Sequence, residues 1–163
     1  MPSMKVDGMD DVFAQLKAIG GSIENVQKVA VYTGMAVIRD EVVRQIQALP
    51  VQNGYIEKKD LPRHVITDRE QDQLIKHIGI AHMDNKNGTV STRISFDGYT
   101  DIRTKAYPRG LPAVMVARSI NSGSSVRTKI PFMRQAQAAA KNKAIEAAAD
   151  AAREALQKLQ QEA

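Results

Sequence analysis

Residues 130–155 read IPFMRQAQAAAKNKAIEAAADAAREA, and this stretch decides the C-terminal architecture. Eleven of the twenty residues from Ala136 to Ala155 are alanine, the residue with the highest intrinsic helix propensity. Pro131 suits a helix start, because its fixed φ and missing N–H are tolerated in the first turn, and Phe132 can plug the core. We therefore predict a helix over 132–161. Its small side chains let another backbone approach closely, and Leu156 and Leu159 are larger anchors near its end.

Apolar residues recur at helical spacing through the N-terminal third of the chain as well. A short amphipathic helix is expected over 8–19, ended by Gly20-Gly21. Ser22 is then expected to act as the N-cap of a long helix over 22–49, which stops before Pro50. Gly34 lies inside this second helix and indicates either a weak point or a site of close packing.

The period changes in the middle of the chain. Residues 74–83 and 89–96 alternate between apolar and polar side chains around Asn87-Gly88, the strongest short hairpin signal. We predict a β-hairpin there, a third strand over 113–120, and one helical turn at most within 66–73. Residues 50–63, 97–112 and 121–130 are expected to be loops.

This order of elements predicts an α+β fold. The expected sheet, within residues 64–120, has three to four mostly antiparallel strands, because the connections are too short for crossover helices. The long helix of the N-terminal half and the alanine-rich C-terminal helix would cover it. A chain of 163 residues fits one domain, so a single unit over 1–163 is expected.

Composition excludes several classes of site. The chain has no Cys, so disulfides, thiolate nucleophiles and Cys-based zinc sites are ruled out. We expect neither a secretory leader, since the first residues lack an apolar run, nor a membrane span, since no apolar stretch is long enough. The protein is therefore expected to fold in a cytoplasm.

The positive charge is concentrated in one region. Residues 101–130 hold six cations against the single acid Asp101, which accounts for the whole net charge of +5. A basic loop can face nucleic acid or an acidic protein, and it can equally be a solvated flexible surface. The cations concerned are Arg103, Lys105, Arg109, Arg118, Arg127 and Lys129.

Residues that could carry chemistry do not form a convincing set. His77 and His82, placed in one strand, would lie on opposite faces, and His64 precedes them in a loop, so no metal site is expected. Helix capping is expected for Asp7, Asp10 and Asp11, and solvation for Asp68, Glu70 and Asp72. The serines near 119–125 lack a nucleophile elbow, and the glycines form no phosphate-binding fingerprint. We predict no catalytic residue, no metal and no cofactor.

One family shows a similar arrangement. The chain has a short N-terminal helix from Gly8 to Leu16, a long helix that ends at Leu49-Pro50, and a Pro-Phe-x-Arg-x-Ala block that opens the last helix. This order resembles the small head–tail joining, neck or tail-completion proteins of lambdoid and related long-tailed bacteriophages. Gln135 stands where many members have a second proline, and Asn121–Ser124 replaces a Glu-aromatic-Gly-Thr segment.

The resemblance implies a non-enzymatic structural protein of the virion neck or tail, assembled in the host bacterial cytoplasm. It implies a ring of six or twelve copies between the connector or head-closure proteins and the tail proteins, with genome DNA passing through. The six cations would line the lumen or face an acidic partner, with transient non-specific contact to DNA. The residues expected at the oligomer or partner interface are Pro131, Phe132, Arg134, Ala136, Leu156 and Leu159.

Two other functions stay open from the sequence. A small non-specific DNA-binding protein would use the basic region 103–129, and its affinity would fall steeply with salt. An enzyme, such as a nuclease or a peptidoglycan hydrolase, would need a metal or a pair of acids that the sequence does not assemble.

Overall fold

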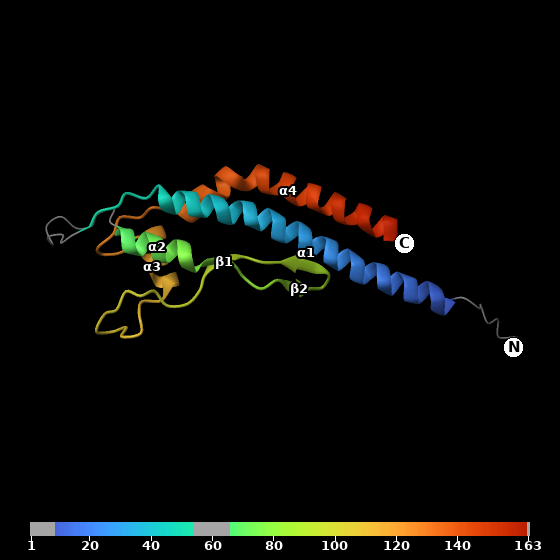
Figure 1. Cartoon of the computed structure of the whole chain (residues 1–163), viewed down its shortest axis with the longest axis horizontal. Helices are drawn as coiled ribbons and strands as arrows, with labels where there is room; N and C mark the ends of the chain where they lie inside the picture. Colours follow the sequence, from blue (N-terminus) through green and yellow to red (C-terminus); the bar gives the residue numbers. More distant parts are fainter. Residues whose placement is uncertain (1–8, 54–65, 163) are drawn as a thin grey trace, which may run out of the picture.

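The computed structural model describes residues 9–53 and 66–162 (Figure 1). The expected cap at Asp7, the first residue of the predicted 8–19 helix, the loop residues 54–63 and His64 lie outside these ranges. Within them the chain is α+β, with helices α1 to α4 and strands β1 to β4.

The two long helices form an antiparallel pair that runs the length of the molecule (Figure 1). Helix α1 spans Met9–Gln47, and at 1.5 Å per residue it reaches about 60 Å. The predicted break at Gly20-Gly21 is therefore wrong, and Ser22 is not an N-cap. A helical glycine costs only about 1 kcal/mol relative to alanine, which the other residues of a 39-residue helix can outweigh.

Helix α4 spans Phe132–Glu162, as the alanine-rich sequence predicts. It packs on α1 through a row of residues four apart: Phe132, Ala136, Ala140 and Ala144 are all buried. The row on α1 has the same spacing, with Gly34, Val42 and Ile46 buried. Rows of this kind allow the ridges of one helix to fit the grooves of the other. A Cβ atom added to Gly34 would lie 3.0 Å from the Ala144 carbonyl oxygen, so Gly34 marks a close approach.

The predicted hairpin is present but interrupted. Strand β1 (Ile78–Ile80) pairs with β4 (Ile94–Phe96), and β2 (Asp84–Lys86) pairs with β3 (Thr89–Ser91), both antiparallel. The turn has positive φ at Asn87 and Gly88, 55° and 78°, as a type I′ turn requires. The result is two sheets of two strands each, instead of one sheet of three to four strands.

Two segments predicted as strand are helical. Helix α2 spans Asp68–His77 and takes up the first residues of the expected 74–83 strand; it is stabilised at its start by a capping box between Thr67 and Glu70. Helix α3 spans Ala113–Asn121, where the third strand was expected. Its buried residues recur at positions i, i+3, i+4 and i+7, which is the helical period. The residues concerned are Ala113, Val116, Ala117 and Ile120.

The core lies at one end of the helix pair. Val42 and Ile46 of α1, Leu74 of α2 and Phe132 of α4 are fully buried there, together with the buried face of α3. Phe132 meets Phe96 edge to face, with ring centroids 6.4 Å apart and an interplanar angle of 80°. The core-plug role that the sequence predicts for Phe132 is confirmed. Beyond this core, α1 and α4 continue as a pair with the hairpin beside α1 (Figure 1).

Candidate interaction surfaces

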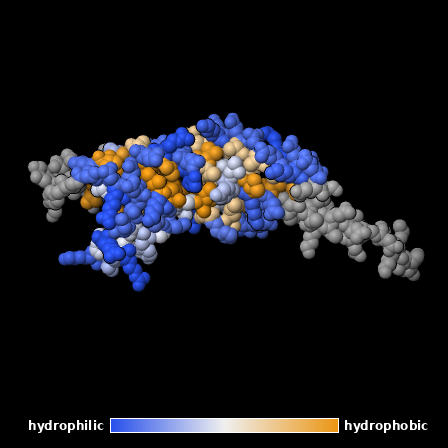
Figure 2. Space-filling view, viewed as in Figure 1, coloured by the Kyte–Doolittle hydropathy of each residue, from blue (hydrophilic) through white to orange (hydrophobic). Residues whose placement is uncertain are grey.

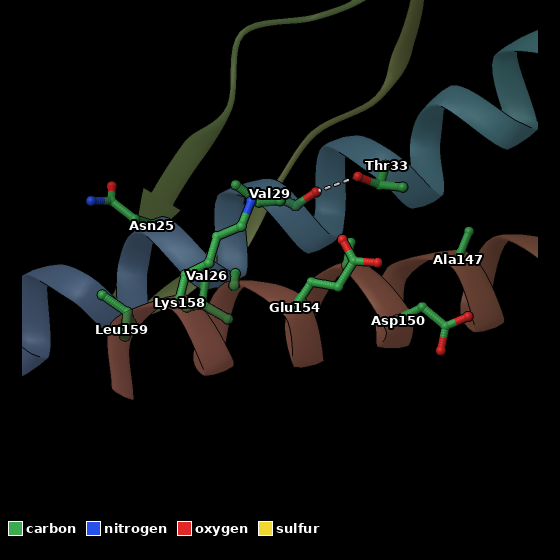
Figure 3. A pocket seen from close by; sticks show the side chains of 11 residues that line it. Asn25, Val26, Val29, Thr33, Ala147, Asp150, Glu154, Lys158 and Leu159 are labelled. Atoms are coloured by element: carbon green, nitrogen blue, oxygen red, sulfur yellow. Dashed lines mark hydrogen bonds between the residues drawn. The ribbon is translucent and has the colours of Figure 1, made fainter. Parts of the chain in front are cut away.

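A groove of about 470 Å³ lies between α1 and α4 toward their outer ends. Val26 and Val29 of α1 form its apolar floor, opposite alanines of α4. Figure 3 shows the side chains of Glu154 and Lys158 reaching from α4 toward these valines. We call this surface groove 1. It is lined by Asn25, Val26, Val29, Thr33, Ala147, Asp150, Ala151, Glu154, Ala155, Lys158 and Leu159.

A second groove of about 520 Å³ lies along the same helix pair nearer the core. It is strongly apolar, and its charged side chains, Arg134 and Lys141, are both cations. We call it groove 2. It is lined by Ala30, Val31, Gly34, Met35, Ile38, Arg134, Gln137, Ala138, Lys141, Ala144, Ile145 and Ala148.

Large apolar side chains are exposed along both helices. Val29 and Tyr32 of α1 are 47% and 52% exposed, and Ile145 and Leu156 of α4 are 58% and 45% exposed. Figure 2 shows hydrophobic residues gathered in patches along the helix pair, between hydrophilic surfaces. Exposed apolar patches of this kind mark surfaces where proteins interact.

The loop over 97–112 projects from the core as an ordered element (Figure 1). Thr100 and Leu111 join its two ends: the Thr100 N–H donates to the Leu111 carbonyl at 2.7 Å, and the Leu111 N–H donates to the Ile102 carbonyl at 2.8 Å. Gly110 has φ of 113°, and a Cβ there would lie 1.8 Å from the Thr100 carbonyl oxygen. The segment is thus a closed surface loop with a fixed base.

Helix α2 anchors this loop. The Arg69 guanidinium donates to the Asp101 carboxylate at 3.0 Å and to the Asp101 carbonyl at 3.2 Å, and the Gln73 side chain accepts from the Asp101 N–H at 3.1 Å. The hydrogen bond from Arg69 holds the pKa of the Asp101 carboxyl below its usual value. The base of the loop therefore has a defined geometry. The loop's exposed cations are Arg103, Lys105 and Arg109.

Arg127 differs from the other predicted cations. Its guanidinium forms an ion pair with Glu70 of α2, and the two side chains are only 17% and 11% exposed. Arg127 is therefore directed inward, and the expectation that it faces a lumen or partner is wrong for this residue. Arg118 and Lys129 are exposed, like the three cations of the loop.

The fold buries some of the predicted interface residues and leaves others exposed. Phe132 and Ala136 are fully buried in the core and cannot contact a partner in this conformation. Pro131 is partly buried at the start of α4. Arg134 lines groove 2, Leu159 lines groove 1, and Leu156 is exposed on α4, so these three remain available.

The residue-level candidates from the sequence all lay on α4 or in the basic region, and none lay on α1. Val29, Met35 and Ile38 of α1 line the grooves because the helix pair continues beyond the part that the rest of the chain covers. The prediction of solvation for Glu70 is also wrong, because Glu70 is buried, caps α2 and pairs with Arg127. The Thr67–Glu70 spacing was a signal that could have found the cap.

The described residues contain no group of three or more His, Asp or Glu side chains that could hold a metal ion. His77 ends α2, and His82 lies between β1 and β2, so the expected placement of both in one strand is wrong. Asp68 receives a hydrogen bond from the Asn53 side chain at 2.6 Å. No helix in the described part of the chain is long and apolar enough to cross a membrane.

Comparison with known proteins found no match to a family model, a curated protein or a solved structure.

Proposed function

We propose that this protein is a non-enzymatic structural subunit of the neck or tail of a long-tailed bacteriophage. In this proposal it forms a ring of six or twelve copies that helps to complete the tail and join it to the head connector, with DNA passing through. It contacts connector or head-closure proteins on one side and tail proteins on the other, within a virion assembled in the host cytoplasm.

The observation that carries the proposal is the apolar surface of the helix pair. Grooves 1 and 2 are two different apolar surfaces on one subunit, at different positions along α1 and α4. A ring is built from head-to-tail contacts, and each subunit must then offer two different faces. Exposed groove residues such as Val29 and Ile145 would be covered in such an assembly.

The projecting loop supports the same proposal. Arg103, Lys105 and Arg109 stand on a closed loop that α2 holds in place. A ring would bring many copies of this loop together, and their combined positive charge would attract phosphate groups or an acidic neighbouring ring.

The test uses the purified full-length protein and isolated phage connectors or tails. Light scattering and negative-stain imaging should show rings, either alone or after mixing with tails. Met35→Glu in groove 2 and Val29→Glu in groove 1 should each prevent ring formation, because each places a charge in an apolar contact. Gln47→Glu, an exposed change outside both grooves, is the control. A strict monomer that never joins connectors or tails would overturn the proposal.

A second candidate function is a small non-specific DNA-binding protein, and the anchored basic loop favours it. It predicts duplex binding that weakens steeply with salt, since each phosphate contact releases a counterion. Neutralising Arg103, Lys105 and Arg109 together should abolish retention on DNA. The matched control neutralises three cations of α4, Lys143, Arg153 and Lys158. Failure to bind duplex DNA at low salt would exclude this function.

A further inference from the structure

Helix α4 has a second apolar face besides the row that packs on α1. Residues spaced alternately three and four apart run along it, the repeat by which one helix packs along another in a coiled coil. In this seam Ile145 and Leu156 are 58% and 45% exposed, although both are large and apolar. We call it the α4 seam. It consists of Ala138, Asn142, Ile145, Ala149, Ala152, Leu156 and Leu159.

The seam and the buried row are different sets of residues. Ala136, Ala140 and Ala144 pack against α1, and none of them belongs to the seam. Ala138 and Ile145 edge groove 2, and Leu159 edges groove 1. Since α1 already occupies the buried row, the seam is left for another helix.

The charge of α4 indicates how that helix runs. Residues 132–145 hold three cations and no acid: Arg134, Lys141 and Lys143. Residues 146–162 hold four acids against two cations: Glu146, Asp150, Glu154 and Glu162 against Arg153 and Lys158. A second α4 lying antiparallel places basic halves beside acidic halves, and it also opposes the helix dipoles. A parallel arrangement places the two basic halves side by side and the two acidic halves side by side.

We infer that the α4 seam binds the α4 seam of a second copy of this chain, antiparallel, about a two-fold axis near Ala149–Ala152. In this register Ile145 lies opposite Leu156 of the other copy, and Ala149 lies opposite its Ala152. The alanines at the centre let the two helices approach closely.

The charges that flank the seam fit this register. Glu146 lies beside Arg153 of the other copy, and the two-fold axis repeats that pair. No like charges meet in these flanking positions. Within one subunit Arg153 pairs with Asp150. Because the two side chains are 71% and 68% exposed, Arg153 can exchange Asp150 for Glu146 of the other copy.

This two-fold contact does not by itself build a ring, because the same face is used on both copies. Because the seam shares Ala138 and Ile145 with groove 2 and Leu159 with groove 1, it is the contact of a free dimer and not a contact inside the proposed ring. It is testable on the isolated protein.

Cysteine cross-linking tests the register, since the chain has no native Cys. The Ile145→Cys and Leu156→Cys variants, distinguished by a mass tag, are oxidised separately and as a mixture. The mixture should give mixed disulfide dimers, and each variant alone should give almost none. Self-linking of each variant alone would show a parallel pair and overturn the inference. The inference would also be overturned if no cross-link forms in the mixture at micromolar protein concentration. Lys143→Cys mixed with Lys158→Cys is the matched control, because both positions lie off the seam.

Charge reversal gives an independent readout. By sedimentation, Glu146→Lys should weaken dimerisation by about tenfold, because it converts two attractive pairs into repulsive ones. Adding Arg153→Glu to the same chain should restore dimerisation, since the reversed charges again meet across the axis. Circular dichroism checks that each variant keeps its helix content. A double variant that dimerises no better than Glu146→Lys would contradict the antiparallel register. If these tests fail while the protein still joins tails, the inferred dimer is wrong and the proposed function is unaffected.

Discussion

Arg127 and Glu70 lie 57 residues apart in the chain and form an ion pair with side chains 17% and 11% exposed. Glu70 has a second role, because its other carboxylate oxygen accepts the Thr67 N–H at 3.0 Å in the capping box of α2. One carboxylate therefore joins the start of α2 to the segment that leads into α4. The Arg127 Nη1 atom is buried and has no hydrogen-bond partner among the described residues, so the pair is tightly enclosed.

We expect Glu70→Ala to destabilise the fold by about 3 kcal/mol, because it leaves the Arg127 charge buried without its partner and removes the cap. Arg127→Ala should cost less, since Glu70 keeps its bonds to Thr67. Urea unfolding followed by circular dichroism measures both. Arg39→Ala removes an exposed pair with Asp40 and should change the unfolding free energy by less than about 0.5 kcal/mol. Equal effects of Glu70→Ala and Arg39→Ala would show that the Arg127 pair does not stabilise the fold.

Gly34→Val should destabilise the helix pair by about 1–3 kcal/mol through overpacking. A Cβ at this position already meets the Ala144 carbonyl oxygen at 3.0 Å and the Ala148 Cβ at 3.2 Å. The control is Gly79→Val in β1, where a Cβ meets nothing within 4 Å. Thermal unfolding should separate the two variants, and a stable Gly34→Val protein would contradict the close approach of α1 and α4.

Gly110→Ala should open the base of the basic loop. Its φ of 113° is strained for any residue with a Cβ, and that Cβ would collide with the Thr100 carbonyl oxygen. Hydrogen exchange should show lost protection of the Thr100 and Leu111 amides. Gly88→Asn, at φ of 78° with open space around it, is the control, because asparagine tolerates positive φ. Unchanged protection in Gly110→Ala would show that the loop base is not held as described.

The loop should also loosen in acid. Arg69 lowers the pKa of Asp101 in the folded protein. A carboxyl with a lowered folded pKa stabilises the fold above its unfolded pKa of about 3.9, and the contribution is lost as pH falls through the lowered folded value. The protection factors of the amides in residues 100–104, which are taken relative to intrinsic exchange at the same pH, should therefore fall below about pH 4. Asp101→Asn should remove most of this pH dependence, and a wild-type loop insensitive to acid would contradict the anchor.

Local features of the sequence were sufficient to predict some of the helices and turns. The alanine content of 136–155 predicts α4, and Asn87-Gly88 predicts the hairpin turn; both signals act within a few residues. The strand predicted at 113–120 failed because its apolar residues fit either period over so short a run, and packing against α2 and β4 selects the helix. The break predicted at Gly20-Gly21 failed because local propensity differs by only about 1 kcal/mol per glycine.

The candidate surfaces depended more on the fold. Leu156, Leu159 and Arg134 were identified from the sequence and are available, whereas Phe132 and Ala136 were identified with them and are buried. Helical spacing shows that a residue lies on an apolar face, but it does not show whether the chain has enough other elements to cover that face. The exposure of Val29 and Ile145 follows from the length of the helix pair relative to the small core.

The sequence by itself determined what short-range chemistry controls: a long alanine-rich helix opened by Pro131-Phe132, a turn at Asn87-Gly88, and a loop region that carries the net positive charge. Only the tertiary structure decided which charges face outward and which apolar faces stay uncovered. Arg127 illustrates the reason. Its sequence neighbours resemble those of the exposed cations, and its inward direction depends on Glu70, a partner brought to it by folding from 57 residues away.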